Sequence, residues 1–135
     1  MKSTSLLVKD IMMREVVTVS PFATLREAML LMNRSKVKAL VMDKRHEHDA
    51  FGILTYTTLL RYIVADEGDI DLISVIDAAA KPVLTVSREL EIKYVAKLMV
   101  NQGVRRIVVT QNNKLEGLIT MDDIVGAILK TLEEE

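Results

Sequence analysis

The chain has 135 residues, half of them hydrophobic, and its 18 basic and 19 acidic side chains leave a net charge of −1. This is an ordinary globular composition, long enough for one compact core or for two small units that share a core. The absence of a basic excess argues against a nucleic-acid partner. Cysteine is absent, which excludes disulfides and thiolate chemistry. No apolar run reaches the length of a secretory signal or a membrane span, so we expect a cytoplasmic protein without a membrane partner.

The first half of the chain alternates helical and strand-like patterns. Apolar side chains recur at helical spacing in three places, and β-branched or apolar runs lie between them. A polar turn, residues 43–49, separates two of the expected strands, and residues 65–69 form a linker. The expected order is helix, strand, helix, strand, strand, helix, over residues 6–13, 16–19, 24–35, 37–42, 50–54 and 57–64.

The second half repeats the first. One register, a shift of 67 residues, holds through several elements, and it becomes a shift of 65 after a turn that is two residues shorter in the second copy. The matched positions include Asp10 with Asp77, Thr18-Val19-Ser20 with Thr85-Val86-Ser87, Gly52 with Gly117, and Thr55 with Thr120. Such a register indicates an internal duplication. A unit of this size buries little surface alone, so we expect the copies to pack about a pseudo-twofold axis and to leave ligand clefts between them.

The stretch that carries the chemistry is Gly117–Asp123, where a predicted strand runs into a predicted helix. Thr120 and Asp123 lie three residues apart on the first helical turn, beside backbone N–H groups that have no partner within the helix. A hydroxyl and a carboxylate placed there can hold a hydroxyl-bearing ligand. They can also form a capping box. The two roles are compatible, because Thr120 can cap the helix while Asp123 faces a cleft.

With this motif inside a duplication, the sequence resembles a tandem pair of cystathionine-β-synthase (CBS) domains, also called a Bateman module. The resemblance covers Val8–Val64 and Leu72–Thr131, nearly the whole chain, so we expect a stand-alone module. It implies a mixed α/β (α+β) fold of two βαββα units, with residues 1–67 as the first CBS domain and 68–135 as the second. It also implies a regulatory function.

The resemblance implies that the ligand is an adenosine nucleotide, AMP, ADP or ATP, with or without Mg²⁺. In the family, the acidic residue of the motif accepts from ribose hydroxyls, backbone at the first strand faces the adenine, and basic residues before the second strand face the phosphates. The matching positions in this chain are Asp123 and Thr120 for the ribose, Lys81, Pro82 and Val83 for the adenine, and Arg105 and Arg106 for the phosphates.

The first copy departs from the motif, because it carries Thr58 where the second carries Asp123. A hydrogen bond to a charged group contributes ~1.5–3 kcal/mol, against about 1 kcal/mol for a neutral one. We therefore expect a dominant site at Asp123 and a weaker second site. The residues of that weaker site would be Val16, Lys38, Thr55 and Thr58.

Two groups of charged residues have alternative interpretations. Arg105 and Arg106 precede a predicted strand, where alternation would send them to opposite faces, so at most one is expected to reach a given phosphate; a solvated strand end is the alternative. His46 and His48 flank Glu47 in the polar turn, but zinc requires three or four fixed ligands. A solvated turn is therefore favoured over a metal site.

The sequence contains no serine, histidine and acid set at a useful spacing and no glycine-rich nucleotide loop, so we expect no enzyme. The helical segments 56–64 and 124–129 carry more apolar surface than one small sheet covers, which predicts a homodimer. A ligand sensor that acts on an unknown regulated protein is the favoured function. The alternative is a ligand-free scaffold for dimerisation or protein interaction, in which the motif only caps a helix.

Overall fold

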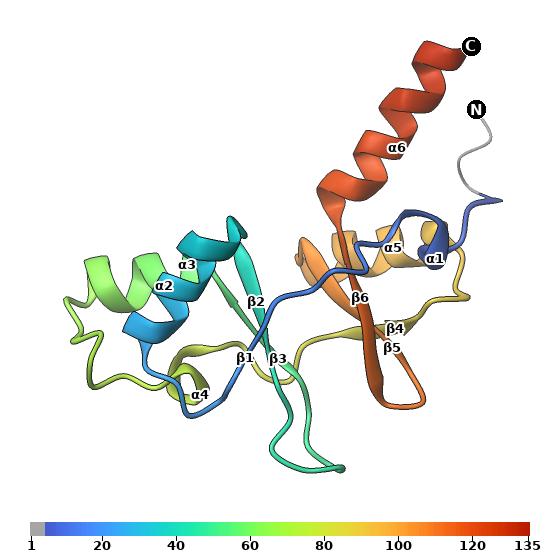
Figure 1. Cartoon of the computed structure of the whole chain (residues 1–135). Coiled ribbons are helices and arrows are strands. Elements are labelled where there is room, and N and C mark those ends of the chain that lie inside the picture. The colour runs from blue at the N-terminus through green and yellow to red at the C-terminus, as the bar shows by residue number, and fades with distance from the viewer. Residues whose placement is uncertain (1–4) are drawn as a thin grey trace. The chain divides into compact units, whose positions relative to one another are not determined.

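The structure is a computed structural model that describes residues 5–135 (Figure 1). The chain divides into two compact units. The first-repeat unit is Val16–Val83, and the second-repeat unit combines the residues up to Glu15 with Leu84–Glu135. Within the described part of the chain, no helix is both long and apolar enough to cross a membrane.

The first-repeat unit is built on a three-stranded sheet of order β1-β2-β3. Strand β1 pairs with β2 in parallel, and β2 pairs with β3 antiparallel, with Leu40 opposite Leu54. A parallel pair needs a crossover, which here is α2. The elements of the first-repeat unit are β1 (Thr18–Val19), α2 (Leu25–Ser35), β2 (Ala39–Met42), β3 (Gly52–Thr55), α3 (Tyr56–Leu59), a π-helix η2 (Leu60–Ala65) and α4 (Val75–Ala78).

The second-repeat unit has the same topology, with sheet order β4-β5-β6, a parallel first pair and an antiparallel second pair. Helix α5 is the crossover between β4 and β5, and α6 follows β6 directly (Figure 1). The elements of the second-repeat unit are α1 (Val8–Ile11), β4 (Thr85–Ser87), α5 (Ile92–Gln102), β5 (Arg106–Gln111), β6 (Lys114–Thr120) and α6 (Met121–Glu134).

The predicted element order and the mixed α+β class are confirmed in both repeats. The main difference concerns the last helix of the first repeat, expected over residues 57–64. Only Tyr56–Leu59 is α-helical there, and the next six residues form the wider η2. The N–H of Asp66 bonds to the carbonyl of Arg61, five residues back, which closes this wider turn.

Each unit has its own hydrophobic core. In the first-repeat unit, α2 buries Leu25, Ala28 and Met32 on one face, where they join Leu40 and Leu54 of the sheet. The second-repeat unit repeats this pattern with Ile92, Val95 and Met99 of α5. Because complete burial of an aliphatic side chain stabilises the fold by ~1.5–3 kcal/mol, these two small clusters supply most of the driving force for folding.

The short leading helix of each repeat belongs to the core of the other repeat's unit. Val8 of α1 lies in the core of the second-repeat unit, and Val75 of α4 lies in the core of the first-repeat unit. After each helix the chain runs beside the second strand of the hairpin in that unit, as isolated bridges pair Met13 with Leu118 of β6 and Ala80 with Ile53 of β3. The boundaries of the compact units therefore lie after Glu15 and after Val83. The boundary between residues 67 and 68 was predicted for the two sequence repeats, and it stays a prediction.

Candidate functional site

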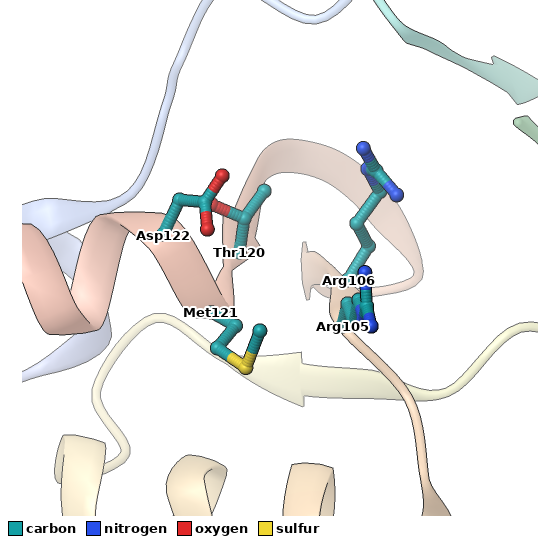
Figure 2. A pocket seen from close by; sticks show the side chains of 5 residues that line it. All are labelled: Arg105, Arg106, Thr120, Met121 and Asp122. Atoms are coloured by element: carbon teal, nitrogen blue, oxygen red, sulfur yellow. The ribbon is translucent and has the colours of Figure 1, made fainter. Parts of the chain in front are cut away.

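A pocket lies at the amino end of α6 in the second-repeat unit (Figure 2). It offers about 120 Å³ of space, which is less than the ~300–1,000 Å³ of pockets that enclose a complete small molecule. The space therefore suits one small polar or charged group of a ligand. The lining residues are Arg105, Arg106, Thr120, Met121 and Asp122.

Strand pairing brings the arginines and the first turn of α6 together at this pocket. The start of β5 lies beside the end of β6, with Arg106 opposite Thr120 in the antiparallel register. The N–H of Met121 also donates to the carbonyl of Arg105 at 2.9 Å. The arginines, which lie about fifteen residues before the helix, are thus held next to its first turn.

Both arginines line the pocket, although strand alternation predicted opposite faces. Arg105 precedes β5, which begins at Arg106, so the alternation of a regular strand does not apply to the pair. Arg105 is exposed and Arg106 is half-buried. That at most one of them reaches a given phosphate stays a prediction.

The charges around the pocket favour an anion. Figure 2 shows the arginine side chains across the pocket from Thr120 and Asp122. Two guanidinium groups outweigh the single Asp122 carboxylate, and the amino end of α6 adds partial positive charge. Guanidinium groups bind phosphate and carboxylate oxygens through paired N–H donors.

The motif residues form the reciprocal capping box that was one of the two interpretations. The N–H of Asp123 donates to Thr120 Oγ1 at 3.0 Å, and the N–H of Thr120 donates to Asp123 Oδ2 at 2.9 Å. Asp123 is half-buried and is not among the residues that line the pocket, whereas Asp122 is. The cap uses one carboxylate oxygen, and a carboxylate has two oxygens that accept hydrogen bonds. The ribose role of Asp123 stays a prediction.

Met121 and Asp122 are pocket residues that sequence reasoning did not select. Both directly follow Thr120, so proximity to the motif was the available signal. Their orientation depends on how the first turn of α6 meets the start of β5, and the motif does not contain that information.

The predicted adenine-facing residues belong to the first-repeat unit, on the segment that leaves its core. The N–H of Val83 donates to the carbonyl of Phe51 at 3.1 Å, and Lys81 pairs with Asp49 at 2.8 Å. Pro82, between them, is exposed. Their assignment to one site with Thr120 and Asp123 stays a prediction that depends on the resemblance.

The predicted weaker site lacks the capping box of its counterpart. Thr55 is the N-cap residue of α3 but makes no side-chain cap hydrogen bond, and Thr58 is half-buried on the same helix. Lys38 is exposed just before β2, and Val16 is half-buried just before β1. The structure thus shows a difference between the two repeats at the position where Asp123 is replaced by Thr58.

The histidines of the polar turn are exposed, and the N–H of His48 donates to His46 Nδ1 at 3.2 Å. Among residues 5–135, no group of three or more histidine and acidic side chains is placed to hold a metal ion.

Comparison with known families identifies the class of protein. The CBS domain family model matches this chain twice, over residues 8–65 and 74–130. The chain belongs to the CBS domain family and contains a pair of these domains. The predicted family and fold class are confirmed.

Similar proteins support this assignment. A cyanobacterial hexameric CBS-CP12 protein has the same fold with a TM-score of 0.85 and 36% identity, over 90% of this chain and 67% of that one. An uncharacterized protein of Methanopyrus kandleri is 32% identical over 97% of this chain and 68% of its own length. An uncharacterized protein of Thermofilum pendens is 29% identical over 87% of this chain and 42% of its own length.

Proposed function

We propose that this CBS pair is a regulatory module that binds an adenosine nucleotide, AMP, ADP or ATP, at the amino end of α6. The observation that carries the proposal is the pocket in which Arg105 and Arg106 lie beside Thr120. CBS pairs are generally regulatory ligand-binding modules, which agrees with a pocket suited to one end of a ligand.

The pocket chemistry suits the phosphate end of the nucleotide. The guanidinium groups supply fixed N–H donors, and the 120 Å³ of space accepts a group of phosphate size. In the proposed mode the phosphate lies at the arginine side of the pocket and contacts Arg105 or Arg106, with Mg²⁺ as an optional companion. The ribose then lies against Asp123 and Thr120.

The two sites should differ in affinity. Asp123 supplies a charged acceptor that is already ordered by its capping box, whereas Thr58 offers a neutral hydroxyl on a helix without such a cap. A charged acceptor contributes ~1.5–3 kcal/mol per hydrogen bond, against about 1 kcal/mol for a neutral one. The site at Val16, Lys38, Thr55 and Thr58 is therefore the weaker one.

The proposed function is regulation without catalysis. A ligand shifts a conformational equilibrium only when its affinity differs between the conformations, and such couplings are typically ~1–3 kcal/mol. The output would be a conformational change that a regulated protein recognises, or a conformational change within a homodimer. The alternative is a scaffold in which the capping box is purely structural.

Self-association follows from exposed apolar side chains on equivalent helices. Tyr56, Leu60 and Val64 are exposed at every fourth position along α3 and η2. A shift of 65 residues matches them to Met121, Val125 and Leu129 of α6, which are also exposed. A related CBS-CP12 protein is hexameric. We propose that this chain forms a homodimer through these helices.

Thermal unfolding with added nucleotide tests the proposed ligand. A ligand that binds only the native state raises the free energy of unfolding by about 2.7 kcal/mol at a hundred times its Kd. We expect AMP, ADP or ATP to raise the Tm, and Asp123→Ala to remove most of that increase. The increase is measured within each variant, because Asp123→Ala also loses the cap.

Thr58→Ala is the matched control, since it alters the equivalent position of the weaker site, and it should keep nearly the whole increase in Tm. If no nucleotide changes the Tm of the native chain, the scaffold alternative replaces the proposal. If Thr58→Ala abolishes the increase while Asp123→Ala keeps it, the assignment of the dominant site is wrong.

A further inference from the structure

The pocket at the amino end of α6 contains an acidic residue, Asp122, among groups that otherwise attract anions. Figure 2 shows its side chain across the pocket from Arg105 and Arg106. Within the described part of the chain, the side chains of these three residues form no hydrogen bond or ion pair. Asp122 does not cap the helix either, because the capping box uses Thr120 and Asp123. The hydrogen bonds of the fold therefore do not account for an acidic side chain at this position.

The charges that line the pocket balance roughly one phosphate group. Two guanidinium groups against the carboxylate of Asp122 leave about one net positive charge, and the amino end of α6 adds ~0.5 of a charge, which the capping carboxylate of Asp123 offsets. A phosphate monoester carries a charge of about −1.5 to −2 at neutral pH. A single phosphate thus meets little excess negative charge, whereas every further phosphate adds charge that no group of the pocket balances.

The space of the pocket sets the same limit. Its volume of about 120 Å³ accepts one group of phosphate size. The second and third phosphates of a longer chain must lie outside this volume. Asp122 is exposed, and charges act on one another over ~8–10 Å at physiological ionic strength, so its carboxylate still repels phosphates that lie just outside the pocket.

The first repeat does not combine two cations with an acid at the matching positions. Lys38 and Ala39 match the two arginines, and Thr57 matches Asp122. The strand registers agree with this match, because Ala39 lies opposite Thr55 in the way that the second arginine lies opposite the motif threonine of β6. An acid that moderates a pair of cations is thus a feature of the second repeat, which contains the site proposed to be dominant.

We propose that Asp122 is a specificity-determining residue that makes this pocket select a nucleoside monophosphate over the corresponding di- and triphosphates. This inference rests on the proposed nucleotide-binding function, and it names the class of ligand that the pocket accepts. A like charge placed against a competing ligand creates specificity when it lowers the affinity of that ligand more than the affinity of the preferred one. The triphosphate chain carries about twice the charge of the monoester, so Asp122 repels it about twice as strongly.

Calorimetric titration with AMP, ADP and ATP tests this role. The three ligands contain the same nucleoside, so their comparison isolates the phosphate chain. The titrations contain a chelator of divalent cations at one fixed ionic strength, because bound Mg²⁺ and added salt both weaken the repulsion. We expect the native chain to bind AMP more tightly than ATP, with ADP between them. Asp122→Asn should tighten ATP binding about tenfold and AMP binding about threefold, so that the preference for AMP falls about threefold.

Glu134→Gln is the matched control, since it removes the same charge from the other end of α6, ~18 Å along the helix and beyond the reach of screened charges. It should leave all three Kd values unchanged. Asp122→Glu keeps the charge at the pocket and should keep the preference for AMP. Because Asp122 is exposed and lies outside the capping box, both substitutions at this position should leave the fold intact.

The outcomes separate the two proposals. If the native chain binds none of the three nucleotides, the nucleotide function fails, and this inference fails with it. If the native chain binds ATP as tightly as AMP, or if Asp122→Asn keeps the native preference, this inference alone is overturned. It is also overturned if added Mg²⁺ tightens ATP binding in the native chain and not in Asp122→Asn, because Asp122 would then hold the metal ion instead of repelling the phosphates.

Discussion

Thr120 and Thr55 occupy equivalent positions, yet only one of them caps its helix with its side chain. Thr120 exchanges two hydrogen bonds with Asp123, three residues later. Thr55 has Thr58 at that distance and makes no side-chain cap hydrogen bond. A hydroxyl cap satisfies an N–H group that would otherwise lack a partner within the helix. The duplicated threonine is therefore stabilising in one repeat and nearly neutral in the other.

Thr120→Ala should lower the free energy of unfolding by about 0.5–2 kcal/mol, the usual cost of a lost hydroxyl cap. Thr55→Ala is the matched control and should cost less than about 0.5 kcal/mol. Urea denaturation followed by circular dichroism measures both values. Equal losses in the two variants would show that the capping box does not contribute to stability.

Among the secondary-structure elements, β6 depends on a glycine where another segment crosses it. A Cβ on Gly117 would lie 2.5 Å from the carbonyl oxygen of Met13 and 3.0 Å from the sulfur of Met12. Met13 exchanges two backbone hydrogen bonds of 2.9 Å with Leu118 at this crossing. The first residue of the Gly-x-x-Thr-x-x-Asp motif is thus required by close backbone approach.

Gly117→Ala should destabilise the fold by ~1–3 kcal/mol, because the backbone of Met13 must shift to admit the methyl group. Gly126→Ala makes the same chemical change on α6, where a Cβ meets no atom within 4 Å, and should stabilise by ~0.5–1 kcal/mol. Differential scanning calorimetry of both variants should give Tm changes of opposite sign. If the Gly117→Ala protein is as stable as the native one, the close approach of the Met13 carbonyl to Gly117 is contradicted.

For the molecule as a whole, the exposed apolar side chains bear on assembly. Tyr56, Leu60 and Val64 in one repeat and Val125 and Leu129 in the other are all more than one-third exposed. Apolar side chains that recur every fourth residue form a stripe along a helix, and such a stripe is typical of a surface covered by a partner. Association of two copies would remove both stripes from water.

Leu129→Glu should shift the proposed dimer toward monomer, with at least about a tenfold increase in the dissociation constant, because a carboxylate would be desolvated at the interface. Val100→Glu is the control, since Val100 is exposed on α5 and belongs to neither stripe, and it should leave the assembly unchanged. Light scattering coupled to size-exclusion chromatography gives both masses. A native protein that is already monomeric at micromolar concentration would rule out the proposed dimer.

The sequence by itself determined the features that depend on neighbouring residues. Apolar periodicity and β-branched runs predicted the order of elements in both repeats, and the matched register predicted their duplication. The capping box of Thr120 and Asp123 was also accessible, because its two residues lie within one helical turn. Local hydrogen bonding and side-chain periodicity are encoded within a few residues, so a linear pattern reveals them.

Only the tertiary structure decided which distant residues meet. The pairing of β5 with β6 places Arg105 and Arg106 beside Asp122, and the path of the chain after α4 places Lys81 against Asp49. The packing of each leading helix in the other repeat's unit is of the same kind. These contacts depend on strand register and on the packing of segments far apart in sequence, and therefore no local pattern specifies them.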